Sequence, residues 1–164
     1  MNHTPTLKSH TLTLRAITQH DTNDLFEIYG DTRVMEFASD PTFTTISMVK
    51  QMMESVNKLK ASGESYEWAI VENQSRKVIG TCGIHSFSEC GTVCEVGCLL
   101  NASFWRKGIM SDALLMLFRH AKNLGISSLL ADINKDNTRS IDLFVKLGFN
   151  QAGGVYKLDF NSGH

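Results

Sequence analysis

The sequence predicts an α/β (α+β) fold: a mixed, mostly antiparallel central sheet of six to seven strands, with about four helices on its two faces. Two observations predict it. Three short apolar segments follow one another between residues 66 and 100, separated by polar turns, as in an antiparallel meander. A long helical pattern then separates two further strand patterns, which indicates a parallel strand–helix–strand unit.

Composition limits the classes of function. At 164 residues the chain is long enough to bury roughly two-thirds of its unfolded surface, and no linker or repeat divides it, so we expect one domain over residues 1–164. The formal net charge of −1 comes without a basic stripe, which argues against a nucleic-acid partner. The first residues resemble no secretory leader and no apolar run is long enough to cross a bilayer, so we expect a cytoplasmic protein without a membrane partner.

The four cysteines contain no CxxC pair and no histidines cluster near them, so we expect reduced thiols and no metal site.

The N-terminal part begins with one strand and one helix. Apolar and polar residues alternate over Leu12–Ala16, which predicts a strand with one face on the core. Asp21 is suited to cap a helix that ends near Gly30. The stretch 31–41 has no periodicity, and we expect it to be irregular.

A longer helix and the meander follow. Thr45 can cap the helix, whose apolar residues keep a helical period until Gly63 ends it. Strand patterns then occupy 66–70, 78–84 and 94–100. Within the last of these, Gly97 marks a bulge or a place where a ligand or another backbone comes close.

The basic turn Trp105-Arg106-Lys107-Gly108 precedes a helical pattern that starts at Ile109. Free amides and the dipole at a helix N-terminus favour an anion such as phosphate, and two cations lie beside them. On the residues alone, an ordinary strand-to-helix turn with two solvated basic residues explains the pattern equally well.

The C-terminal part completes the sheet. Residues 129–133 predict a short strand parallel to the 94–100 strand. The polar segment 134–138 can cap a further helix, which Gly148 ends with Phe149 packing back in a Schellman arrangement. Residues 155–160 predict a last strand.

Six short segments, in this order and spacing, carry a resemblance that runs almost end to end. They are Leu14-Arg15-Ala16, Val78-Ile79-Gly80, Glu95-Val96-Gly97, Trp105-Arg106-Lys107-Gly108-Ile109, Asn134-Lys135-Asp136-Asn137-Thr138-Arg139-Ser140 and Leu147-Gly148-Phe149. Together they resemble the GNAT (Gcn-five-related) N-acetyltransferases, in particular the RimJ/RimL-like branch. The resemblance implies transfer of an acetyl group from acetyl-CoA directly to a primary amine, either a protein N-terminus or a small molecule, through a ternary complex.

The resemblance also implies where acetyl-CoA binds. In the family the fourth strand splays from the fifth, and the pantetheine arm bonds to the exposed strand edge while the diphosphate lies on the basic turn. The implied contact residues here are Cys98, Leu99, Leu100, Arg106, Lys107, Gly108, Ile109, Met110, Asn134 and Asn137. Trp105 and Met110 depart from the family's signature residues in the turn, and relatives often have Gly at the position of Arg106, so weaker CoA binding is left open.

Acetyl transfer needs a neutral amine, stabilisation of the developing oxyanion and a proton for the leaving thiolate. By resemblance, the backbone N–H of Cys98 or Leu99 polarises the thioester and Ser140 supplies the proton. Glu95 is the first candidate base and Glu67 the second. The competing interpretations are that Glu95 is a solvated strand residue and that Ser140 only helps to cap its helix.

Two other functions compete. The unusual residues in the basic turn fit a CoA-binding module without catalysis. A Rossmann-type enzyme ranks far lower because no GxGxxG motif follows the first strand. The acceptor amine and a homodimeric assembly are both left open by the sequence.

Overall fold

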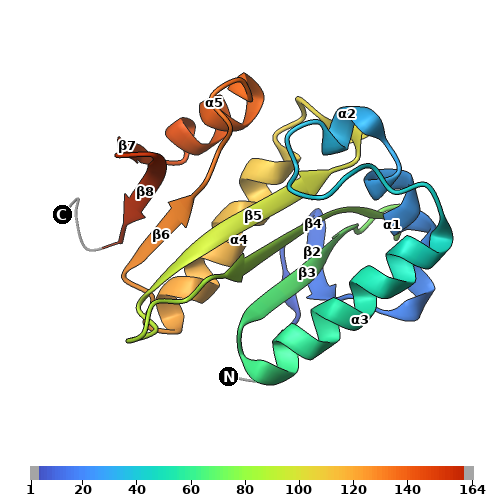
Figure 1. Cartoon of the computed structure of the whole chain (residues 1–164), viewed down its shortest axis with the longest axis horizontal. Coiled ribbons are helices and arrows are strands. Elements are labelled where there is room, and N and C mark those ends of the chain that lie inside the picture. Colours follow the sequence, from blue (N-terminus) through green and yellow to red (C-terminus); the bar gives the residue numbers. More distant parts are fainter. Residues whose placement is uncertain (1–3, 161–164) are drawn as a thin grey trace.

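The computed structural model describes residues 4–160, which form an eight-stranded sheet with helices on both faces (Figure 1). The strand order is β1-β2-β3-β4-β5-β6-β8-β7. Among the described strands, β5 and β6 form the one parallel pair, and the other neighbours are antiparallel. The strands are β1 (Leu7–Lys8), β2 (Leu12–Ala16), β3 (Ser65–Glu72), β4 (Val78–His85), β5 (Val93–Leu100), β6 (Ser128–Ala131), β7 (Asn150–Ala152) and β8 (Val155–Asp159).

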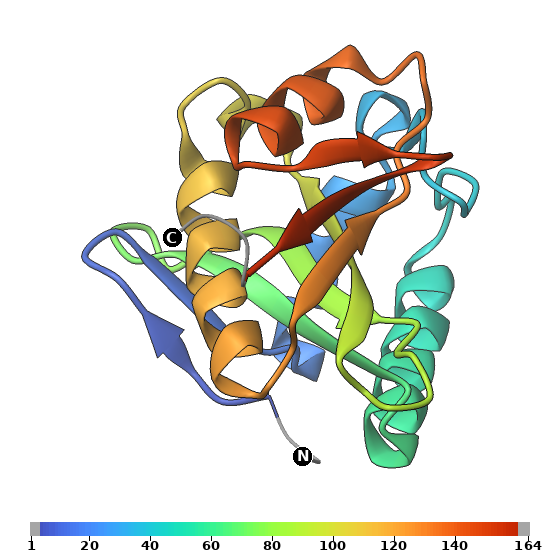
Figure 2. The same cartoon turned by 90° about the vertical axis from the view of Figure 1, so that its left-hand side faces the viewer.

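The helices lie in two layers, one on each face of the sheet. Figure 2 shows α3 on one side and α4 on the other. The α-helices are α1 (Thr22–Tyr29), α2 (Thr32–Met35), α3 (Ile46–Ser62), α4 (Ile109–Asn123) and α5 (Thr138–Lys146), and 3-10 turns occupy Gln19–Asp21 and Ala102–Phe104. None of the helices within residues 4–160 combines the length and apolar character that a membrane crossing requires.

Each face of the sheet has its own apolar core. On the α4 and α5 face, side chains such as Trp68 and Leu114 are fully buried. On the α1 and α3 face, Leu25, Ile28 and Val49 are fully buried. Burying one such side chain contributes about 1.5–3 kcal/mol, so both layers are held firmly on the sheet.

The predicted helix ends are confirmed where local signals set them. The side chain of Thr45 accepts a hydrogen bond from the amide of Met48, and Gly63 has φ 77°. The amide of Phe149 donates to the carbonyl of Phe144 at 3.0 Å, and their rings pack edge to face at 5.0 Å, which is the predicted Schellman arrangement.

Two short strands and one short helix go beyond the prediction. β1 and β7 contain two and three residues and lie at the two edges of the sheet. The expectation of an irregular 31–41 segment is wrong for its first part. There, the carboxylate of Asp31 accepts a hydrogen bond from the amide of Arg33 and starts the single turn of α2.

The predicted splay between two neighbouring strands is present between β5 and β6. β5 pairs with β4 as far as Leu100, but it pairs with β6 only over Val93–Glu95. Beyond Glu95 the two strands separate and leave an opening in the sheet (Figure 1).

Candidate active site

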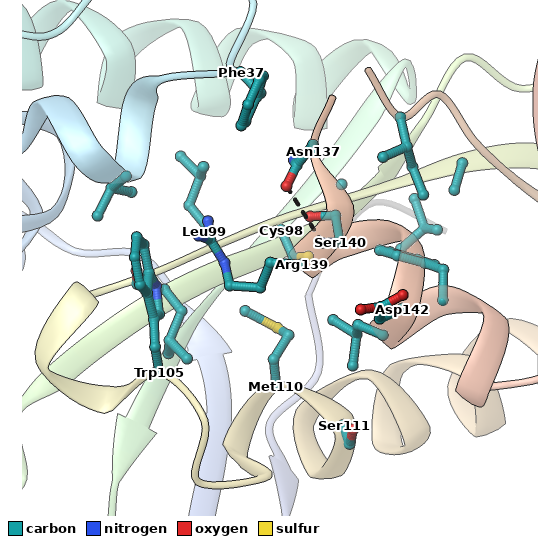
Figure 3. Close-up of a pocket in the computed structure, with 18 of the residues that line it drawn as sticks. Phe37, Cys98, Leu99, Trp105, Met110, Ser111, Asn137, Arg139, Ser140 and Asp142 are labelled. Atoms are coloured by element: carbon teal, nitrogen blue, oxygen red, sulfur yellow. Dashed lines mark hydrogen bonds between the residues drawn. The ribbon is translucent and has the colours of Figure 1, made fainter. Parts of the chain in front are cut away.

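A cavity of about 490 Å³ lies at the opening between β5 and β6. Its walls come from β5 (96–100), from 131–134 at the end of β6, and from the N-terminal ends of α4 and α5. Phe37, just after α2, closes one side (Figure 3). The volume is in the range of small-molecule and cofactor sites.

The edge of β5 presents unpaired backbone groups to this cavity. The amide of Asn101 donates to the carbonyl of Ile79 on the β4 side at 2.7 Å, and the groups of an antiparallel strand alternate in direction. The amides of Cys98 and Leu100 therefore face the opening, whereas that of Leu99 faces β4. The indole N–H of Trp105 donates a hydrogen bond to the carbonyl of Leu100 at 2.9 Å. Of the predicted edge residues, Cys98 therefore has the backbone that is better placed to bind a ligand.

The N-terminus of α4 is open. Gly108, with φ 74°, precedes the helix and offers no side-chain cap. Within residues 4–160, the amides of Ile109, Met110 and Ser111 have no hydrogen-bond acceptor. All four residues line the cavity, so three free N–H groups and the positive end of the helix dipole are available to an anion.

The two basic residues of the turn differ in position. Arg106 lines the cavity and has φ 63°, a left-handed conformation that is costly for a residue with a side chain. Lys107 is not among the cavity-lining residues, and its ammonium group lies 5.5 Å from the centre of the Phe104 ring. Arg106 is therefore the cation of this turn that can meet a ligand inside the cavity.

The N-terminus of α5 borders the same cavity but is capped. The side-chain oxygen of Asn137 accepts a hydrogen bond from the backbone amide of Ser140 at 3.3 Å (Figure 3). Ser140, Asn137 and Asn134 all line the cavity. Both sequence interpretations of Ser140 therefore have a structural basis, because its amide serves the cap while the residue lines the cavity.

One contact in the cavity was not expected from the sequence. The guanidinium of Arg139 stacks on the ring of Trp105, 3.6 Å from its centre, and so joins the start of α5 to the loop after β5 (Figure 3). Desolvation lowers the pKa of Arg139. In the sequence, the one sign that Arg139 could belong to the site is that it precedes the candidate residue Ser140.

The two candidate bases lie outside the set of cavity-lining residues. Glu95 is in the part of β5 that still pairs with β6, opposite Leu130. Glu67 lies on β3, partly buried, and its carboxylate is hydrogen-bonded to Thr81. Desolvation raises the pKa of Glu67 to about 7, while the hydrogen bond acts in the opposite direction.

Comparisons with known proteins identify relatives of this chain. A model of the acetyltransferase (GNAT) domain matches residues 11–150. The chain is 29% identical over 149 residues to the uncharacterized N-acetyltransferase p20 of Bacillus licheniformis, covering 90% of this chain and 84% of that protein.

Solved structures share the fold at low sequence identity. A GNAT-family acetyltransferase from Bacillus anthracis superimposes with a TM-score of 0.83 at 16% identity, covering 94% of this chain and 98% of that one. RimL, a ribosomal L7/L12 alpha-N-protein acetyltransferase solved in complex with coenzyme A, gives a TM-score of 0.83 at 18% identity and covers 97% and 100%.

Proposed function

The chain belongs to the acetyltransferase (GNAT) domain family, and from this membership we propose that it transfers the acetyl group of acetyl-CoA directly to a primary amine in a ternary complex. One observation carries the proposal: a splayed strand edge and an uncapped helix N-terminus face the same cavity. The strand edge can hydrogen-bond the amide groups of a pantetheine arm, and the helix N-terminus can bind phosphate. Coenzyme A contains both groups.

The residues fit such a ligand in two parts. We assign the diphosphate to the amides of Ile109 and Met110 with the guanidinium of Arg106, and the pantetheine arm to the backbone of Cys98. The complex of RimL with coenzyme A supports this assignment, since it has the same fold. Asn134 would contact the ligand from the opposite wall.

The thioester of acetyl-CoA supplies an activated acetyl group, and the chain supplies proton transfer and polarisation. The amide of Cys98 would donate to the thioester carbonyl, where negative charge develops. The hydroxyl of Ser140 would give a proton to the departing thiolate. A carboxylate would take the proton of the amine, and Glu95 and Glu67 are the two candidates.

Acetyl-CoA turnover with a panel of amines tests this function. The panel contains a short peptide with a free N-terminus, methylamine, a polyamine and free amino acids, and release of the CoA thiol is measured. We expect release that depends on an amine. Binding of acetyl-CoA without turnover on any amine would instead support a CoA-binding module without catalysis.

Ligand specificity is testable without an acceptor. Acetyl-CoA and CoA should raise the melting temperature more than NAD or ATP at equal concentration, because a ligand that binds only the folded state stabilises it by mass action. Equal shifts for all four ligands, or none, would contradict the assignment of the cavity to coenzyme A.

A further inference from the structure

Three residues form a row across the middle of the sheet. Glu67 on β3 pairs with Gly83 on β4, and Gly83 pairs with Gly97 on β5. Residues directly opposite each other on adjacent strands point to the same face, here the face covered by α1 and α3. Beyond Gly97 lies the opening between β5 and β6.

The carboxylate of Glu67 fills the space over Gly83. A Cβ atom at Gly83 would collide with the Oε2 atom of Glu67 and lie 2.6 Å from the carbonyl oxygen of Tyr66. The carboxylate is also bonded to Thr81, whose Oγ1 atom is 3.2 Å from the hydroxyl of Tyr29. Packing therefore explains the glycine at 83 and fixes the carboxylate one strand away from β5.

Packing does not explain Gly97. A Cβ atom there would have one neighbour within 4 Å, the Nε2 atom of His85 at 3.7 Å, which is an ordinary van der Waals contact. Gly97 also lines the cavity. Apart from the imidazole of His85, the space above it is therefore open, and it lies between the carboxylate of Glu67 and the opening.

Glu67 has no cationic partner of its own. Within residues 4–160 it forms no ion pair, and its stabilising contact is the neutral hydroxyl of Thr81. The other titratable groups around it are Tyr29 from α1, the thiols of Cys82 and Cys98, and, along the same face, His85 and Glu95. A carboxylate that is desolvated without a cation is a suitable partner for an incoming ammonium group.

We propose that the acceptor amine binds over Gly97 and that Glu67 is the group that takes its proton; this inference rests on the proposed acetyl transfer. Adjacent strands are about 4.8 Å apart, so an amine over Gly97 is within reach of the carboxylate directly or through one water. With a pKa raised to about 7 by desolvation, Glu67 can accept a proton near neutral pH.

In the proposed step the nitrogen loses two protons and gains one bond. Glu67 removes one proton from the ammonium group and later releases it to solvent. The neutral nitrogen forms a bond to the acetyl carbon, and the carbon–sulfur bond breaks. The second nitrogen proton is lost as the thiolate gains one through Ser140, so the products are an amide, CoA thiol and one free proton.

Glu67→Gln tests the role of the carboxylate. Glu72→Gln, on the same strand but far along it from the cavity, is the matched control, and Glu95→Gln tests the rival base. With methylamine or a short peptide as acceptor, Glu67→Gln should lower kcat roughly 10²- to 10⁴-fold, the usual contribution of general base catalysis. The dissociation constant for acetyl-CoA should stay unchanged, and Glu72→Gln should behave as the wild type.

The pH profile separates catalysis from a structural role. In the wild type, kcat/KM for the amine should rise as pH increases through about 7, because only the ionised carboxylate accepts a proton. This rise should be absent in Glu67→Gln, and its defect should shrink at high pH, where the amine loses its proton unaided. A defect that is independent of pH would overturn the assignment to Glu67.

Gly97→Ala tests where the amine binds. The added methyl group fits the folded chain, so the melting temperature and acetyl-CoA affinity should be retained while KM for the amine rises. An unchanged KM would contradict the placement. A normal Glu67→Gln enzyme together with an inactive Glu95→Gln enzyme would overturn the inference and leave acetyl transfer intact, whereas a wild-type protein that acetylates no amine would overturn the proposed function itself.

Discussion

Helices α4 and α5 both begin at the same cavity, but the first amides of α4 are uncapped whereas α5 has a side-chain cap. At α4, Gly108 leaves the first amides of the helix without acceptors. At α5, the side chain of Asn137 satisfies the amide of Ser140. This difference supports our proposal that the open end of α4 receives the anionic part of the ligand, whereas the cap at α5 holds the backbone of Ser140 in place beside the cavity.

Of the changes at these two helix ends, the largest expected effect concerns the capped end. Ser140→Ala removes the hydroxyl but keeps the backbone amide that Asn137 binds, so the melting temperature should hardly change. If the hydroxyl serves the leaving thiolate, kcat should fall roughly ten- to a thousand-fold with acetyl-CoA affinity retained. Steady-state kinetics and thermal melts on one preparation measure both quantities. Intact turnover would contradict the role of Ser140 in catalysis and leave it with a role at the start of the helix alone.

A smaller effect is expected at the open end. Arg106→Glu should raise KM for acetyl-CoA on the order of tenfold with less change in kcat, because the side chain would contact a phosphate far from the reacting carbon. Lys107→Glu is the matched control: its ammonium group lies over Phe104 outside the cavity lining, and its KM should change less. Equal effects of the two reversals would show that only overall charge matters.

The smallest effect distinguishes a cap from a ligand contact. Asn137→Ala should cost about 1 kcal/mol of unfolding free energy, measured by urea denaturation, because the amide of Ser140 loses its acceptor. Asn137→Asp keeps an acceptor and should restore stability. If Asn137 also binds coenzyme A, as the sequence resemblance implies, KM for acetyl-CoA will rise in the alanine variant beyond what the stability loss explains.

The parts of the fold that could be predicted are those set by local chemistry. Thr45 and Gly63 mark the ends of α3 because a side-chain acceptor and a left-handed residue act within one turn. β7 could not be predicted, because all three of its residues are exposed and it exists only through pairing with β8. The single turn of α2 has a local signal, since Asp31 accepts a hydrogen bond from the amide of Arg33, but four helical residues are too few to show a helical period.

The site divides in the same way. The open helix N-terminus at Gly108 could be predicted because the turn and the helix are adjacent in sequence. The raised pKa of Glu67 could not be predicted, because it depends on residues of another strand. The carboxylate packs over Gly83 and is hydrogen-bonded to Thr81, both on β4. The stacking of Arg139 on Trp105 likewise depends on the separation of β5 from β6.

The stack of Arg139 on Trp105 also gives the protein an optical reporter. The chain has two tryptophans, and Trp68 is fully buried with its indole N–H bonded to the carbonyl of Pro5 at 2.9 Å. Its surroundings should not change when the cavity fills. Trp105 lines the cavity, and a ligand that enters should displace or alter its guanidinium neighbour. The change in intrinsic fluorescence on titration with coenzyme A should therefore come from this one indole.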